Sequence, residues 1–441
     1  MKRLNLKLII FLILTSVIAV HAQTKVLSLD EAIKSGLENS HQLKLSNNNI
    51  NAATEKYKDY ESQVYPSLKA TAGYIRLSPV APFTFEFPGS STSYTFFPVY
   101  LNSYSSQIAA YEPFYNGLRA KNTLKSQYFL EQAAKFDYDK DKSDIIYNII
   151  NAYYNIYKIK VSKALIDENI EQINQHIKET QDYEKNGLAV HNDVLKVELQ
   201  KSNAEFTRLD LQNNLEVAIY NYNILLGIPP ETKTEIDSNS LFSVREVKSL
   251  DDYMKDAMNN RGDIKASDSR NKATELNLEV TKGSYLPQLG VGANIYYSNP
   301  NPRLIPPDDV FKETWDAGIY FSYDISSLYT NKHKVAQSKI QVEQSKENYN
   351  LLLDNARMEI NQCYTAYKEA LQKIELSKTT IVEADENYRT EHSRYTNHVA
   401  LLSDLLDANV ALLQAKINLA LSTTDAELAY YKLMKSIGNS K

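Results

Sequence analysis

Two aspartates stand three residues apart in an otherwise aliphatic helical pattern, in the stretch SDLLDA near the end of the chain. Positions three apart share one face of a helix, so the carboxylates of Asp404 and Asp407 would lie together and could attract cations. An echo of the phrase, NDVLKV, occurs earlier in the chain. The echo keeps the first acid as Asp193 and has Lys196 in place of the second.

A simpler role for these acids is helix capping. Asp193 and Asp404 follow Asn192 and Ser403 at apparent helix starts, where the helix dipole stabilises an acid by about 0.3–1 kcal/mol. Asp407 lies one turn further in, so capping explains it less well. Both roles stay open from the residues alone.

Other site chemistry is poorly supported. His392 and His398 near Glu391 suggest a metal, but no H-E-x-x-H motif or closed ligand set accompanies them. We therefore expect solvated helix residues there, no metal site and no cofactor. No G-x-S-x-G motif or phosphate-binding loop is present, and the single cysteine, Cys363, cannot form an internal disulfide. The sequence predicts no catalytic residues and no enzyme activity.

Composition narrows the class of protein. The 441 residues carry a net charge of −5, which argues against a nucleic-acid partner. Only 12 glycines accompany 32 tyrosines, a balance that favours long helices with aromatic surfaces. We expect helical tyrosines such as Tyr153 to pack between helices.

The N-terminus has the features of a secretory signal peptide. Lys2 and Arg3 precede an apolar run, and the sequence VHA then offers a cleavage site before Gln23. The apolar run is short for a membrane span. No cysteine lies directly after the cleavage site, so the mature protein is expected to carry no lipid.

The chain contains an internal repeat. SLDEAIKSGLENSHQLKL begins at Ser28 and SLDDYMKDAMNNRGDIKA begins at Ser249, 221 positions later. Pro66 and Pro287 are separated by the same interval. The predicted divisions are a signal peptide at 1–22, a first repeat at 23–228, a linker at 229–248 and a second repeat at 249–441.

Each repeat reads as helix, strand, loop, strand and very long helix. Leu29 to about Ser62 is helical in pattern and is followed by Pro66, which cannot continue a helix. From about Leu118 to Leu226 there is no proline and one glycine, Gly187. Such a stretch predicts helices of roughly 50–70 residues, or about 75–105 Å, in a coiled-coil assembly.

The predicted strands alternate apolar residues with small or polar ones. In LGVGANIYY and WDAGIYFSYDI one face is apolar and includes Trp315, the only tryptophan. The pattern is typical of transmembrane barrel strands, although a soluble sheet packed on a helix would give it too. Weaker strands are expected at Leu68–Tyr74 and Tyr104–Tyr111. Proline-rich loops at 77–100 and 298–313 should cap the barrel, and because four strands cannot close one, several chains must contribute.

The signal peptide, the repeat, the two prolines and the phrases DVL and DLLDA make the chain resemble the TolC family of outer-membrane efflux proteins. The resemblance implies a mainly α fold with a small transmembrane β part. A homotrimer would form a barrel of twelve strands, four per chain, and an α-helical barrel in the periplasm of a Gram-negative bacterium. It also implies a passive exit channel, for efflux or type I secretion, with a periplasmic adaptor and an inner-membrane transporter of the RND, ABC or MFS type. A soluble periplasmic coiled-coil scaffold without a pore is the alternative.

The resemblance also assigns residues to roles. Asp404 and Asp407 match acids that line the periplasmic constriction, and Asp193 and Tyr395 match a pair that helps hold the end shut. Where the family often has glycine and a constraining arginine, this chain has His398 and Ala400, so the latch is expected to be weaker or differently made. The expected adaptor contacts are Asn186, Gly187, Leu188, His398, Val399 and Ala400.

Overall fold

The computed structural model describes residues 25–237, 245 and 247–439. The predicted signal peptide and part of the predicted linker lie outside the described residues. The chain divides into two compact units, and each takes segments from both predicted repeats. Unit 1 is Met1–Asn47, Phe136–Lys265 and Leu352–Lys441, and unit 2 is Asn48–Lys135 and Ala266–Leu351.

The helices confirm the internal repeat. Apart from the four-residue α8 (Ser327–Thr330), they form four pairs with one member from each repeat, and the partners agree in length to within two residues. In the described part of the chain, no helix is both long enough and apolar enough to cross a membrane. The pairs are α2 (Leu29–Asn39) with α6 (Leu250–Asn260), α3 (His41–Ser62) with α7 (Gly262–Gly283), α4 (Arg119–Lys185) with α9 (Lys332–Thr396), and α5 (His191–Leu226) with α10 (Leu402–Ser436).

Two details of the helix prediction were wrong. The expected helix from Leu29 to Ser62 is broken at Ser40, which has an extended ψ of 118° and whose hydroxyl accepts a hydrogen bond from the Leu43 backbone N–H at 3.2 Å. Ser40 thus ends α2 and caps α3. The expected length of 50–70 residues holds for α4 and α9, with 67 and 65 residues, but α5 and α10 have only 36 and 35.

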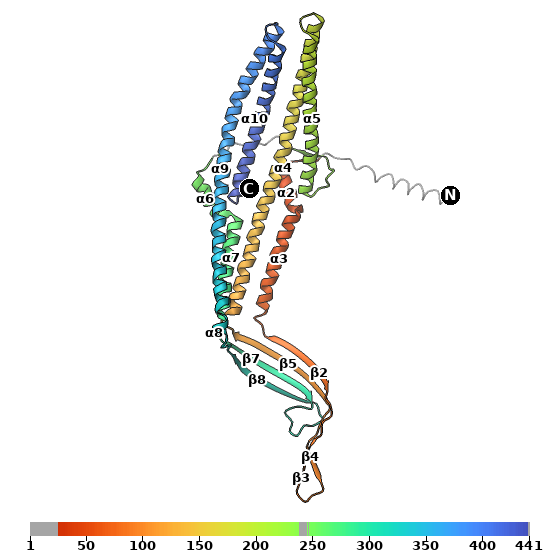
Figure 1. The fold of residues 1–441 in the computed structure, drawn as a ribbon, viewed down its shortest axis with the longest axis vertical. Helices are drawn as coiled ribbons and strands as arrows, with labels where there is room; N and C mark the ends of the chain where they lie inside the picture. Colours follow the sequence, from red (N-terminus) through yellow and green to blue (C-terminus); the bar gives the residue numbers. More distant parts are fainter. Residues whose placement is uncertain (1–24, 238–244, 246, 440–441) are drawn as a thin grey trace, which may run out of the picture. The chain divides into compact units, whose positions relative to one another are not determined.

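Unit 2 contains the four predicted strands in one antiparallel sheet (Figure 1). The strand order is β2-β5-β7-β8, so β2 and β8 are the two edges. Pro66 and Pro287 immediately precede the first residues of β2 and β7, as the repeat predicts. The strands are β2 (Ser67–Arg76), β5 (Asn102–Tyr115), β7 (Gln288–Asn299) and β8 (Lys312–Ser322).

The two faces of this sheet differ in chemistry. On one face Ile108, Ile295 and Trp315 are neighbours across three strands, and Trp315 and Ile319 are 71% and 76% exposed. On the other face the Gln107 amide donates to Asn294 at 3.0 Å, and the Asn294 amide donates to Asp316 at 2.7 Å. An open apolar face and a hydrogen-bonded polar face are what a strand between lipid and an aqueous lumen requires.

Neither proline-rich loop adds a further strand to the four-stranded sheet, but the first is more ordered than expected. It forms a separate hairpin of β3 (Phe83–Glu86) and β4 (Ser93–Phe97). The second loop returns over the polar face of the sheet. There the Arg303 guanidinium donates to the Trp315 carbonyl oxygen at 2.8 Å and to the Asp316 carboxylate at 3.1 Å, beside a cavity of about 750 Å³.

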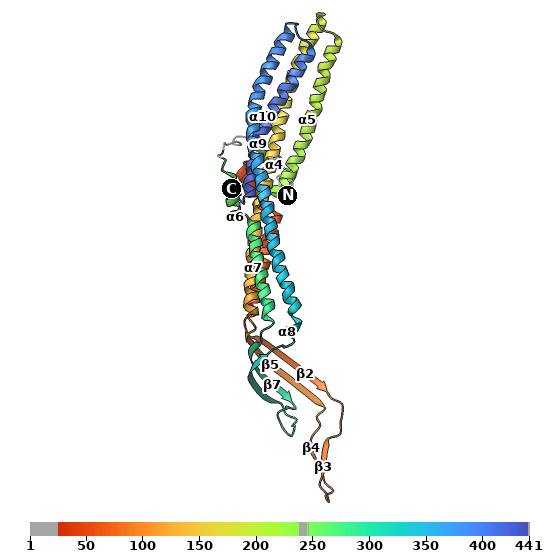
Figure 2. The same ribbon diagram turned by 60° about the vertical axis from the view of Figure 1, so that its left-hand side comes forward.

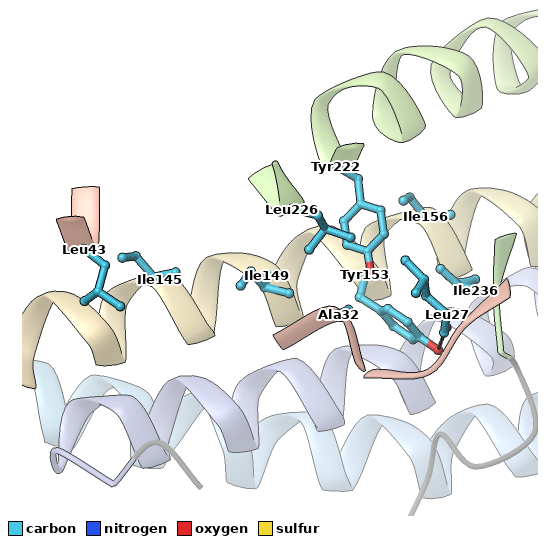
Figure 3. Close-up of a cluster of buried hydrophobic side chains, with 10 residues drawn as sticks. All are labelled: Leu27, Ala32, Leu43, Ile145, Ile149, Tyr153, Ile156, Tyr222, Leu226 and Ile236. Atoms are coloured by element: carbon cyan, nitrogen blue, oxygen red, sulfur yellow. Dashed lines mark hydrogen bonds between the residues drawn. The ribbon is translucent and has the colours of Figure 1, made fainter. Parts of the chain in front are cut away.

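A buried cluster in unit 1 joins elements from both ends of the first repeat (Figure 3). Two short parallel strands that contribute to this cluster, β1 (Lys25–Leu27) and β6 (Thr234–Ile236), were not predicted, and β6 lies within the predicted linker. Tyr153 is buried as expected, and its hydroxyl donates to the Asp237 carbonyl oxygen at 2.6 Å. Burial raises the pKa of Tyr153 to about 12, so the hydroxyl keeps its proton.

The exposed apolar face of the sheet can be tested by charge placement. We expect Ile319→Arg to lower the free energy of unfolding in lipid vesicles by up to about 2–4 kcal/mol, because the guanidinium would enter hydrocarbon. Thr71→Arg, on the polar face, should have little effect. The measurement is denaturant unfolding of both variants in vesicles, and an equal loss in the two would contradict a lipid-facing Ile319.

Candidate functional site at the helical tips

Unit 1 contains two helical hairpins, α4–α5 and α9–α10 (Figure 2). The two hairpins end in turns of the same type. After α4, Gly187 has a φ of +74°, and the Leu188 N–H donates back to the Tyr183 carbonyl at 2.8 Å. After α9, His398 has a φ of +59°, and the Val399 N–H donates to the Arg394 carbonyl at 2.9 Å. All six residues expected to contact an adaptor lie in these two turns.

His398 explains how the second turn does without glycine. A left-handed φ is uncommon for residues other than glycine, although histidine is among those that adopt it more often. The His398 ring packs edge-on against Tyr183 with centroids 4.8 Å apart, and Tyr183 packs against Tyr395 at 5.6 Å. This aromatic contact offsets the backbone strain of the turn.

Four aliphatic side chains protrude from the tips. Leu188, Val190, Val399 and Leu401 are between 60% and 70% exposed. Aliphatic residues are uncommon in short exposed turns. Their presence in the sequence could have identified this surface without the resemblance to a known family. Isolated exposed apolar residues are ordinary, but four on neighbouring turns form a patch suited to a protein contact.

Asp404 and Asp407 lie in the first two turns of α10, and both are exposed. The leucines between and beside them, Leu402 and Leu405, are buried in a cluster with Tyr395. In the part of the chain that the structure describes, neither carboxylate has a hydrogen bond or ion pair. The leucines therefore anchor the helix start, and the two acids are presented away from that core.

Asp193 is used differently. One of its oxygens accepts from the Val190 backbone N–H at 3.4 Å, and the other pairs with Lys196 at 3.1 Å. These contacts are those of a capping acid at the start of α5. Asp193 thus has local partners that Asp404 and Asp407 lack.

Tyr395 is buried close to the tips. Its hydroxyl lies 3.2 Å from the Thr180 hydroxyl, and burial raises the pKa of Tyr395. Within the described residues of a single chain no hydrogen bond joins Tyr395 to Asp193. The expected latch between them stays a prediction.

A family model described as outer membrane efflux protein matches residues 32–222 and 253–439. The chain belongs to the outer membrane efflux protein family. Among curated relatives, the probable efflux pump outer membrane protein TtgC of Pseudomonas putida is 21% identical over 417 residues, 92% of this chain and 82% of that protein. BepC, an outer membrane efflux protein of Brucella suis, is 19% identical over 326 residues, 74% of this chain and 70% of its own.

Solved structures share the fold. The outer-membrane channel OprN aligns with a TM-score of 0.78 at 16% identity, covering 93% of this chain and 90% of that one. VceC, an outer membrane protein of Vibrio cholerae, aligns with a TM-score of 0.79 at 16% identity, covering 93% and 96%. The mainly α fold with a small β part is thereby confirmed.

Family membership also decides between the two functional interpretations. The protein is an outer-membrane efflux channel whose helical part lies in the periplasm, as the sequence predicted. The soluble scaffold is not supported. Members of this family are channels, which is consistent with the prediction that the protein is not an enzyme.

Proposed function

We propose that this efflux channel is the passive exit duct of a tripartite system and works as a homotrimer. Substrate would cross without reacting, and an inner-membrane transporter of the RND, ABC or MFS type, joined through a periplasmic adaptor, would supply the energy. The observation that carries the trimer is the four-stranded sheet, with an exposed apolar face and two open edges.

Open edges argue for a multi-chain barrel. Each unpaired backbone group costs several kcal/mol in hydrocarbon, so a membrane sheet must close on itself. Four strands are fewer than the eight of the smallest membrane barrels. Three copies would pair the β2 edge of one chain with the β8 edge of the next and form a barrel of twelve strands.

The helices offer a second argument for association. An exposed apolar stripe follows one face of α5, because its members recur mostly at three-, four- and seven-residue intervals. In a coiled-coil assembly such a stripe packs against a neighbouring helix. The stripe is Leu195, Leu199, Phe206, Leu209, Val217, Tyr220 and Ile224.

The acids of α10 would form the constriction. In a trimer, Asp404 and Asp407 would place six carboxylates around one axis, and such a ring selects for cations. Their exposure and lack of partners in the described chain favour this role over capping. The latch between Asp193 and Tyr395 belongs to the same proposal, as does a division into repeats at the 229–248 linker.

We expect Phe206→Asp to prevent trimer formation, because it puts a charge into the proposed stripe contact at a position exposed in the single chain. Glu205→Ala, beside it and also exposed, should leave the trimer intact. Light scattering of the detergent-purified proteins gives the mass directly. If the Phe206→Asp protein is still a trimer, the α5 stripe does not lie in the subunit interface.

The constriction can be tested by conductance in a planar bilayer. We expect a small cation-selective conductance that loses most of its selectivity in Asp404→Asn/Asp407→Asn, because the ring charge is gone. Asp354→Asn/Glu375→Gln, which removes two exposed carboxylates from α9, is the matched control. Unchanged selectivity in the first variant would show that these acids only cap the helix.

Tyr395→Phe should raise the conductance if its hydroxyl takes part in the latch.

The aliphatic tips are proposed to receive the adaptor. We expect Leu188→Asp/Val399→Asp to lose adaptor binding and export, since charges would replace apolar contacts, while the trimer persists. Asp182→Ala, exposed near the end of α4, is the control. Co-purification with the adaptor measures binding, and loss of the trimer itself in the double variant would refute a purely adaptor-contacting role.

A further inference from the structure

Three side chains with metal-binding atoms converge between α4 and α9 in unit 1. His176 and Glu179 come from α4, one turn apart, and His392 comes from α9. One donor atom of each residue lies within 4.8 Å of the other two. The sequence alone predicted a solvated His392, because its partners lie more than two hundred residues away in the chain and no local motif indicates them.

We propose that His176, Glu179 and His392 bind a transition-metal dication of the zinc class, with a solvent molecule as the fourth ligand. The His176 Nδ1 lies 3.2 Å from the Glu179 Oε2, and the His392 Nε2 lies 3.6 Å from the same oxygen. Tetrahedral bonds of about 2.0–2.1 Å put neighbouring ligand atoms roughly 3.3–3.4 Å apart. Two of the three ligand-atom pairs are therefore close to the required spacing, and the third pair, between the two imidazoles, lies within 4.8 Å.

The donor set indicates the class of ion. Two imidazoles and one carboxylate suit zinc, copper or nickel, whereas magnesium and calcium prefer oxygen ligands throughout. Three protein ligands with an open fourth position is an arrangement that zinc commonly accepts. The His176 side chain is 3% exposed, while those of Glu179 and His392 are each 36% exposed, so an ion could reach the cluster from solvent on that side.

Tyr388 orients both histidines. Its hydroxyl lies 3.1 Å from the His176 Nε2, the nitrogen that does not face Glu179, and this contact leaves Nδ1 directed at the cluster. Its ring also stacks on His392, with an interplanar angle of 19°. Metal-binding histidines usually have such a partner on the second nitrogen, and its loss typically weakens binding about 10–100-fold.

The position of the cluster gives the ion a role. His176 lies nine residues before the end of α4 and His392 four residues before the end of α9, roughly 14 and 6 Å from the turns at 1.5 Å per residue. A bound ion would fasten the first hairpin to the second just below the tips. Binding does not depend on the proposed exit function, so each can fail alone.

The test is metal titration of the full-length protein in detergent after treatment with a chelator. We expect saturable binding of one Zn²⁺ per chain by calorimetry, and visible Co²⁺ absorption bands that Zn²⁺ removes. His392→Gln and Glu179→Gln should each weaken binding at least about tenfold, and Tyr388→Phe about 10–100-fold. His176 is left unchanged because it is buried.

His191→Gln is the matched control. It removes another exposed histidine that pairs with a carboxylate, Glu184 at 3.0 Å, on the α4–α5 hairpin, and should leave binding unchanged. Two results would overturn the proposal. One is the absence of saturable Zn²⁺ binding, and the other is equal weakening by His392→Gln and His191→Gln, which would indicate adventitious surface binding.

Discussion

A peptide group in hydrocarbon has no water to bond with, and much of this structure follows from that constraint. Only helices and closed barrels satisfy all backbone groups within a membrane. The four-stranded sheet of a single chain is neither of these. The exposed face around Trp315 and the hydrogen-bonded face around Asn294 suit a wall between lipid and water. The open sheet edges suit a wall completed by other copies, so in the proposed trimer assembly would be part of folding.

The internal repeat supplies the same elements twice and then allows the copies to differ. At the tips, Asp193 caps its own helix while its counterpart Asp404 has no local partner in the described chain. Lys196 likewise stands where the second copy has Asp407. The first copy thus uses its one acid for local structure, and the second leaves both of its acids available for the proposed constriction.

Periodic features could be predicted from the sequence, and features that depend on distant pairing could not. The long helices and four strands follow from regular spacing, and Pro66 and Pro287 mark the strand starts. The break at Ser40 was missed because the helical pattern runs through it. The parallel pairing of β1 with β6 involves only three residues from each strand. The His176 cluster needs two helices in register, which no local pattern records.

The turn at His398 has a consequence for tolerance to mutation. At Gly187, where nothing lies within 4 Å of an added Cβ, a substitution has to meet only the backbone requirement for a left-handed φ. At position 398 a replacement must meet that requirement and also fill the space against Tyr183. Glycine at position 398 would remove the backbone strain of the left-handed φ but would lose the ring contact with Tyr183. The two copies of one turn have therefore become unequal in the sequences they can accept, and the second is the more narrowly specified.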